Sequence, residues 1–189
     1  MPSRALQTWL TVRRQALDEI ENAHRRVGGT RRGRRHATRQ LNHGHTHLLS
    51  AQFQGSCREL HDESVDVLVR WNMPVGLRKG CEKSLLLARK LDTGNPNPGN
   101  LGADFGRFGL EFWQEVYQLD ARNADRRQQL RELNEWRNAI AHQDAVALAR
   151  KPLHLHEVRQ WRRVCENLAS YFDEVMRMHI ESITGASPW

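Results

Sequence analysis

The 189-residue sequence contains no apolar run that is long enough for a signal peptide or for a membrane span. Its three cysteines lie far apart and have no paired spacing, which argues against a disulfide framework and against a cysteine metal site. Each falls on or near a predicted apolar helix face, so we expect ordinary core thiols at Cys57, Cys81 and Cys165. A chain of this length can bury a core, and we expect one cytoplasmic domain, residues 1–189, with no membrane partner.

The sequence also lacks the alternation of apolar and polar residues that indicates β-strands, and it has no internal repeat or heptad run. Apolar residues instead recur at helical spacing. The first helix is predicted over residues 3–27, with an apolar stripe formed by Trp9, Val12, Ala16, Ile20, Ala23 and Val27. Further helices are predicted over residues 46–70 and 79–91, from about 104 and 123, and after 152. The sequence therefore predicts an all-α fold, an up-and-down bundle of five to six helices.

A loop crowded with turn residues is expected over residues 92–102. It is long for a plain connection, which suggests a gate beside a site, and we assign no chemistry to its residues.

Lysine is scarce, since arginine supplies all but four of the 29 basic residues in a chain of net charge +7. Residues 24–39 contain seven arginines and no acid, and the rest of the chain is neutral, with 22 basic and 22 acidic residues. The segment lacks apolar periodicity and aromatic residues, so the sequence predicts a basic loop or arm over residues 24–45 that does not stack on bases. Guanidinium groups suit phosphate oxygens, and a plain solvated loop is the competing interpretation. The expected nucleic-acid-binding residues are Arg25, Arg26, Arg31, Arg32, Arg34, Arg35 and Arg39.

Histidines occupy every second position at His43, His45 and His47, a pattern that suggests a metal site. No acid or cysteine lies nearby with ligand spacing, so adventitious metal binding is the most that the pattern predicts. We expect no catalytic metal and no cofactor.

The segment from residue 129 to 142 concentrates groups that suit phosphate chemistry. Its apolar residues recur at helical spacing: Leu130, Leu133, Trp136 and Ile140. Arg137 falls inside that stripe, and Asn138 and His142 share the adjoining edge. A guanidinium on a core-facing stripe needs a partner such as a phosphate, and an imidazole can move protons beside it. An ordinary helix end is the competing interpretation, because the negative end of a helix favours Arg and His in any case.

The pattern Arg137-Asn138 followed by His142, late in a helix, resembles the signature of the HEPN superfamily, most sharply over residues 130–142 and plausibly over 104–183. HEPN domains are all-helical bundles, and many are metal-independent ribonucleases of toxin–antitoxin and other defence systems. The resemblance implies that Arg137, Asn138 and His142 are catalytic, and that two motifs face each other in a homodimer. Asp144 departs from the pattern of members that an antitoxin silences by nucleotide transfer, which have Tyr there, so that control is not expected.

We therefore expect a metal-independent endoribonuclease that cleaves single-stranded RNA by 2′-hydroxyl attack, as a toxin or defence effector. The expected partners are RNA, a second copy of the chain, and a cognate antitoxin or regulatory protein. The alternative is a HEPN-like module that binds RNA or protein without cutting. A DNA-associated regulator is a third hypothesis, but no helix-turn-helix spacing supports it.

Overall fold

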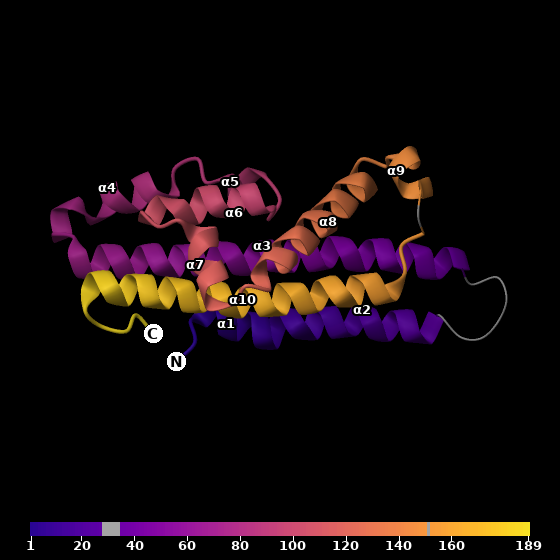
Figure 1. Ribbon diagram of the computed structural model, residues 1–189, viewed down its shortest axis with the longest axis horizontal. Coiled ribbons are helices and arrows are strands. Elements are labelled where there is room, and N and C mark those ends of the chain that lie inside the picture. The colour runs from indigo at the N-terminus through magenta and orange to yellow at the C-terminus, as the bar shows by residue number, and fades with distance from the viewer. Residues whose placement is uncertain (28–34, 151) are drawn as a thin grey trace.

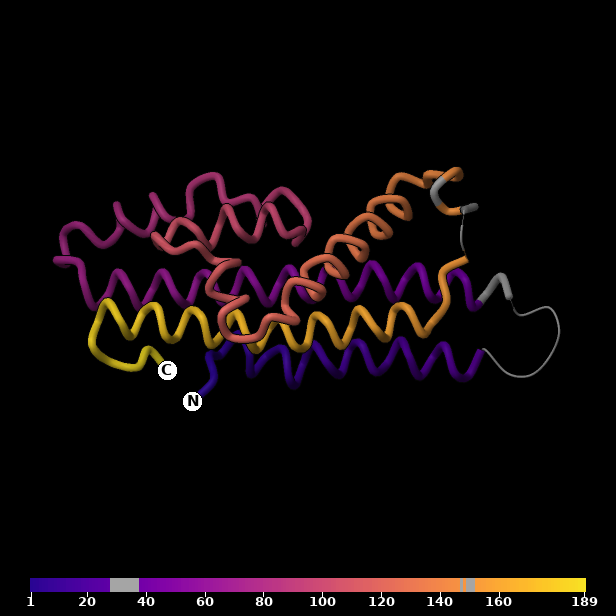
Figure 2. The backbone as a smooth tube through the Cα atoms, in the orientation of Figure 1, coloured from indigo at the N-terminus to yellow at the C-terminus, as the bar shows by residue number. Residues whose placement is uncertain are grey.

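The computed structural model describes residues 1–27, 35–150 and 152–189, and within those ranges it forms helices and no β-strand (Figure 1). The all-α class predicted from the sequence is confirmed. The body of the fold consists of four long helical segments: residues 4–27, α3 (Arg35–Asn72), α8 (Asn123–Ala141) and α10 (Leu155–Thr184). Successive members of this set run in opposite directions, which is the expected up-and-down order (Figures 1 and 2).

Short helices connect these segments. Between α3 and α8 lie α4 (Val75–Leu86), α5 (Lys90–Thr93), α6 (Pro98–Phe105), the 3-10 turn η2 (Gly106–Phe108) and α7 (Phe112–Leu119), and α9 (Ala145–Arg150) follows α8. The side chain of Asn97 caps α6 by accepting a hydrogen bond from the backbone N–H of Asn100, and Pro98 occupies the first turn. The loop predicted over residues 92–102 is therefore shorter than expected, because its second half is helical.

The first helical run contains a π turn that shifts its apolar stripe. The run comprises α1 (Arg4–Thr8), the π-helical η1 (Trp9–Arg13) and α2 (Arg14–Val27). A π turn bonds residue i to residue i+5, so the next inward-facing position comes later than in an α-helix. Val12 is consequently 67% exposed, contrary to the predicted stripe. Arg13 takes the inward position instead, where its guanidinium contacts Gln52 and Glu59 of α3.

The basic loop predicted over residues 24–45 is wrong at both ends. Residues 24–27 form the last turn of α2, and residues 35–45 form the first turns of α3. Residues 28–34 lie outside the part of the chain that the structure describes. The start of α3 was missed because its inward-facing side chains are polar, and apolar periodicity therefore does not reveal it. The buried polar residues of this stretch are Asn42, His43, His45 and Thr46.

The buried apolar residues form one continuous cluster, to which the N-terminal run, α3 and α10 all contribute. Trp9 packs edge-on against Phe53 of α3, with ring centroids 5.8 Å apart. Phe53 packs in turn against Phe172 of α10 at 6.0 Å. These three rings tie the N-terminal segment to the two central helices and fix the position of α3 in the bundle.

Two of the cysteines are buried in this core, as predicted. Burial raises the pKa of the Cys57 thiol and that of the Cys165 thiol, so neither is a reactive thiolate. Cys81 is half-buried and packs against the same cluster. Among the described helices, none is long and apolar enough to cross a membrane.

Candidate functional site

The three residues of the predicted motif lie at the carboxyl end of α8. Arg137 and Asn138 are half-buried, whereas His142 is the C-cap residue and is exposed. Arg137 Nη1 donates a hydrogen bond to Asn138 Oδ1 at 3.2 Å. Leu130 and Leu133 are fully buried, as their spacing predicts, and they anchor the helix in the core. The end of a fixed helix thus presents a guanidinium, an amide and an imidazole.

A Schellman motif sets the backbone around His142. The N–H of Gln143 donates to the carbonyl O of Ile140 at 3.2 Å, and the N–H of Asp144 donates to the carbonyl O of Ala139 at 2.9 Å. Gln143 adopts the left-handed conformation, with φ of 51°, at the position where glycine is usual. The chain therefore turns sharply after α8 and leaves His142 at the tip of the helix.

The loop over residues 94–97 lies against the motif helix. Asn95 Nδ2 donates to Asn138 Oδ1 at 3.0 Å, and Asn134 Nδ2 donates to the carbonyl O of Pro96 at 3.2 Å. Asn97 Nδ2 donates to Asn95 Oδ1 at 2.7 Å, which orients the Asn95 amide. The sequence suggested a gate beside a site for this loop, but it did not predict these contacts to the motif helix. The cluster of asparagines in it was the available signal, because amide side chains pair readily with one another and with backbone carbonyls.

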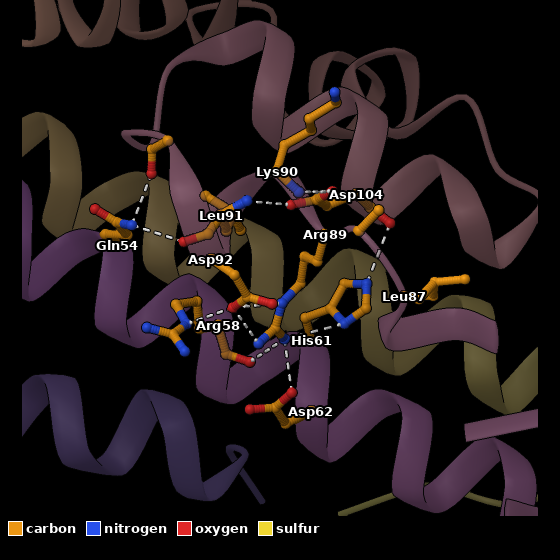
Figure 3. Close-up of polar contacts among 12 residues, drawn as sticks. Gln54, Arg58, His61, Asp62, Leu87, Arg89, Lys90, Leu91, Asp92 and Asp104 are labelled. Carbon is orange, nitrogen blue, oxygen red and sulfur yellow. Dashed lines mark hydrogen bonds and ion pairs between the residues drawn. The ribbon is translucent and has the colours of Figure 1, made fainter. Parts of the chain in front are cut away.

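Arg89, which precedes α5, is the centre of a polar network that holds this loop on α3 (Figure 3). Its side chain is 5% exposed and forms ion pairs with Asp62 at 2.6 Å and with Asp92 at 2.8 Å. Its Nη1 also lies 3.5 Å from Nδ1 of His61, whose Nε2 is 3.2 Å from the carbonyl O of Asp104. Burial, together with the charge of Arg89, lowers the pKa of His61 to about 4, so this ring is neutral near pH 7. The network is a structural support for the site.

The carboxylate of Asp104 anchors the start of α5. It is fully buried and accepts hydrogen bonds from the backbone N–H groups of Lys90 and Leu91 at 2.8 and 2.7 Å (Figure 3). Gln54 of α3 donates from Nε2 to the carbonyl O of Leu91 and of Gly94 at 2.6 and 2.7 Å. Hydrogen bonds thereby join the start of α5 to α6 and its end to α3. The loop that follows is held against α8.

The first turns of α3 lie against the segments that follow α8. Arg39 Nη2 donates to the carbonyl O of Leu148 in α9 at 3.4 Å. Asn42 Nδ2 donates to the carbonyl O of Leu153, just before α10, at 2.8 Å. This stretch of α3 therefore contacts the segments that follow α8, and α3 as a whole also packs against α8.

His43 and His47 lie on the same face of α3 as Arg39. His43 is buried and His47 is half-buried. Burial and then the charge of Arg137 lower the pKa of His47, and burial followed by the charges of Arg39 and His47 lowers that of His43. Arg137 therefore lies within electrostatic reach of His47. This face of α3 was not predicted from the sequence, because the start of the helix was not; the four-residue spacing of Arg39, His43 and His47 would otherwise have indicated it.

His45 lies on the opposite side of α3, toward α2 and α10. Burial lowers its pKa to about 4, while the charge of Glu21 raises the pKa and that of Arg162 lowers it. Because alternate positions on a helix face different sides, His45 cannot share an ion with both His43 and His47. The helical start of α3 thus removes the geometry on which the alternating pattern suggested metal binding.

The arginines predicted to bind nucleic acid flank the undescribed segment. Those with described side chains are all exposed: Arg25, Arg26 and Arg39. Outside the described part of the chain lie the side chains of Arg31, Arg32, Arg34 and Arg35. The end of α2, the start of α3 and α9 lie at the same end of the molecule (Figure 1). The described ends of the basic segment, residues 24–27 and 35–39, therefore lie at the end of the molecule toward which α8 runs.

A model of the family described as RiboL-PSP-HEPN matches residues 81–177, which is just over half of the chain. The chain belongs to this HEPN family. No curated protein gives a match, and no solved structure does. The resemblance that the motif predicted is therefore confirmed at the level of the family.

In this HEPN protein the matched residues include α5, the loop over 94–97, all of α8 and most of α10. The motif residues and Asn95 therefore belong to the matched HEPN portion. The helices α1 to α3, and with them His43 and His47, lie outside the matched residues.

Proposed function

We propose that this HEPN protein is a metal-independent endoribonuclease that acts in the cytoplasm and cleaves single-stranded RNA. The strongest support is the placement of Arg137, Asn138 and His142 together at the free end of α8. A guanidinium for a phosphate and an imidazole for proton transfer are the groups that RNA cleavage without metal requires. The excess positive charge of residues 24–39 supports an anionic polymer as the substrate, and the described ends of this segment lie at the same end of the molecule.

In the proposed reaction the ribose 2′-hydroxyl attacks the adjacent phosphorus. Arg137 binds the phosphate and stabilises the charge that develops on it, which is usually among the largest contributions to catalysis. His142 moves a proton, a role that typically accelerates a reaction by about 10²–10⁴-fold. Asn138 Oδ1 already accepts from Arg137 and Asn95, so its Nδ2 is the atom that donates to a phosphate oxygen. The products are a 2′,3′-cyclic phosphate and a 5′-hydroxyl.

We further propose that the whole chain is one domain and that its active unit is a homodimer, with the ends of the two α8 helices close together. The setting is a toxin or defence system, with a cognate antitoxin or regulatory protein as partner. Sedimentation at micromolar concentration should show a dimer. A monomer that retains full cleavage after dilution would contradict the dimer.

The test of the activity is cleavage of single-stranded RNA and of the matching DNA in the presence of a chelator. RNA should be cut and DNA should not, because only ribose supplies the internal nucleophile. His142→Ala should abolish cleavage while helical circular dichroism stays unchanged. Expression of the unchanged protein should arrest growth, and His142→Ala should relieve that arrest.

The matched control is His179→Gln, at the far end of α10, where Gln can keep the hydrogen bond of His179 Nε2 to the carbonyl O of Phe108. This variant should cleave normally. Full cleavage by His142→Ala would refute the site. Binding of RNA without cleavage by the unchanged protein would instead favour the alternative, a HEPN module that binds and does not cut.

A further inference from the structure

The side-chain amide of Asn138 has a donor end and an acceptor end of nearly the same shape, so its neighbours decide which end faces the substrate. In the proposed reaction Nδ2 donates to a phosphate oxygen, whereas a rotated amide would turn Oδ1 toward the phosphate and repel it. Arg137 Nη1 donates to Oδ1 at 3.2 Å, but the same guanidinium also binds the phosphate in that reaction. A second donor is therefore needed to hold the amide while Arg137 engages the substrate.

A row of hydrogen bonds that starts at α6 supplies this donor. The backbone N–H of Asn100 donates to Asn97 Oδ1 at 2.9 Å. Asn97 Nδ2 donates to Asn95 Oδ1 at 2.7 Å, and Asn95 Nδ2 donates to Asn138 Oδ1 at 3.0 Å. A backbone N–H can only donate, so it fixes the acceptor end of Asn97 and, through each bond in turn, the acceptor ends of Asn95 and Asn138.

The backbone of the loop that carries Asn95 is held by further contacts. Asn100 Nδ2 donates to the carbonyl O of Asn95 at 2.8 Å, and Asn134 of α8 donates from Nδ2 to the carbonyl O of Pro96 at 3.2 Å. A Cβ at Gly94 would lie 2.6 Å from Asn100 Nδ2, so the amide of Asn100 fits there only because residue 94 is glycine. The loop is thereby joined to both α6 and α8, and it presents Asn95 to Asn138 in one position.

We propose that Asn95 is a positioning residue, which keeps Nδ2 of Asn138 directed toward the phosphate and is itself oriented by Asn97. This inference rests on the proposed ribonuclease activity and adds to it a control of the motif by the loop over residues 94–97. Neither Asn95 nor Asn97 touches the substrate. The row lies within one chain, so it would orient Asn138 in each of the two motifs of the proposed homodimer.

The decisive variant is Asn97→Asp, which reverses the row without removing the cap of α6. A carboxylate still accepts from the N–H of Asn100, and its charge is favourable at the start of a helix. It has no hydrogen to donate to Asn95, however, and it attracts Nδ2 of that residue instead. The Asn95 amide then turns its oxygen toward Oδ1 of Asn138, and repulsion between the two oxygens rotates the Asn138 amide.

We expect Asn97→Asp to slow single-turnover cleavage at saturating RNA by about tenfold or more, because a donor to the developing charge is lost. Urea titration should show little change in stability, since the cap remains. Thr93→Asp is the matched control for charge: it adds a carboxylate at an exposed position of the same stretch, leaves the row intact and should cleave normally.

A double-mutant cycle tests whether Asn95 acts through Asn138. Asn95→Ala should slow cleavage by about fivefold, the effect of one hydrogen bond of about 1 kcal/mol. In the Asn138→Ala background the same substitution should have no further effect, because the amide that it orients is gone. A residue that only supported the fold would slow cleavage equally in both backgrounds.

A measurement without RNA examines the row itself. The side-chain amide of Asn138 gives resonances in a nitrogen–proton correlation spectrum, and they are identified by their loss in Asn138→Ala. These resonances should shift in Asn97→Asp and in Asn95→Ala, and they should stay in place in Thr93→Asp.

The outcomes separate this inference from the proposed function. Normal cleavage by Asn97→Asp, with His142→Ala inactive, would overturn the positioning role and leave the proposed ribonuclease intact. Equal slowing by Asn95→Ala in both backgrounds would also overturn it, and so would unmoved Asn138 resonances in Asn97→Asp. Absence of RNA cleavage by the unchanged protein would refute the proposed function, and the positioning role with it, even if the resonances shift as expected.

Discussion

Asn95 donates a hydrogen bond from Nδ2 to Asn138 Oδ1 at 3.0 Å, and this contact joins the loop over residues 94–97 to the motif helix. The same oxygen accepts from Arg137 Nη1 at 3.2 Å. With two donors on its oxygen, the Asn138 side chain is fixed in one orientation, and its Nδ2 is directed away from them.

The orientation of Asn138 predicts that Asn138→Asp lowers the rate of cleavage, although Asp and Asn side chains are similar in size. The new carboxylate keeps an acceptor for Asn95 and Arg137 but replaces the Nδ2 donor with an oxygen that repels phosphate. The single-turnover rate should fall at least tenfold, and RNA affinity should weaken, as measured by quenched cleavage and by fluorescence anisotropy. Asn95→Ala, which removes one neutral hydrogen bond of about 1 kcal/mol, should have a smaller effect. Equal rates for Asn138→Asp and the unchanged protein would contradict the contact to phosphate.

Gln143→Gly should stabilise the protein, because Gln143 has φ of 51° where glycine carries no steric penalty. The expected gain in the free energy of unfolding is up to about 1 kcal/mol, since greater freedom of the unfolded chain offsets part of the relieved strain. Urea titration measures it. Gln118→Gly, within α7, is the opposite control and should destabilise by about 1 kcal/mol, because Gly weakens a helix interior. Destabilisation by Gln143→Gly would show that the Gln143 side chain stabilises the turn by more than its backbone strain costs.

His45 and His61 predict a loss of stability in mild acid. Burial lowers the pKa of each to about 4 from a reference value of 6.5. Between these values the unfolded chain binds protons that the folded chain does not, so the free energy of unfolding falls as the pH falls from about 6.5 to about 4. Each histidine contributes a slope of up to about 1.4 kcal/mol per pH unit.

His45→Leu should therefore flatten this pH dependence by up to about half. Within the described part of the chain neither ring nitrogen of His45 has a hydrogen-bond partner, so Leu should be tolerated at pH 7. Urea titrations at pH 7, 6, 5 and 4.5 give the slope. His156→Ala, at an exposed position, should leave it unchanged. An unaltered slope in His45→Leu would show that His45 does not remain neutral in the folded protein.

The arginines of the basic segment should govern the salt dependence of RNA binding. We expect a variant with four Arg→Gln substitutions to bind RNA more weakly and to reduce the slope of log K against log salt by up to about 3 units. The substituted residues are Arg31, Arg32, Arg34 and Arg35. Cleavage at saturating RNA should survive, because the motif is intact. A control with the same charge change at exposed arginines elsewhere should keep the slope; its substituted residues are Arg14, Arg70, Arg122 and Arg163. Identical slopes for both variants would show that only net charge matters.

The helical class and the motif were predictable because both depend on spacing within single helices. Leu130 and Leu133 recur at helical spacing and are fully buried, and the distance along one helix places Arg137 and Asn138 near His142 whatever surrounds it. The register of the first helix was not predictable, because the π turn that exposes Val12 depends on how Arg13 meets Gln52 and Glu59 in another helix.

The start of α3 was hidden for a related reason. Its inward face is polar, and Asn42 on that face donates to the backbone carbonyl of Leu153, more than 100 residues away in the sequence. Local spacing alone was sufficient to indicate a helix that ends in Arg137, Asn138 and His142. Only the tertiary structure decided that α3 lies against α8 and that Arg39 meets Leu148, because contacts between helices join residues more than 100 positions apart, and no periodicity within either helix encodes such a contact.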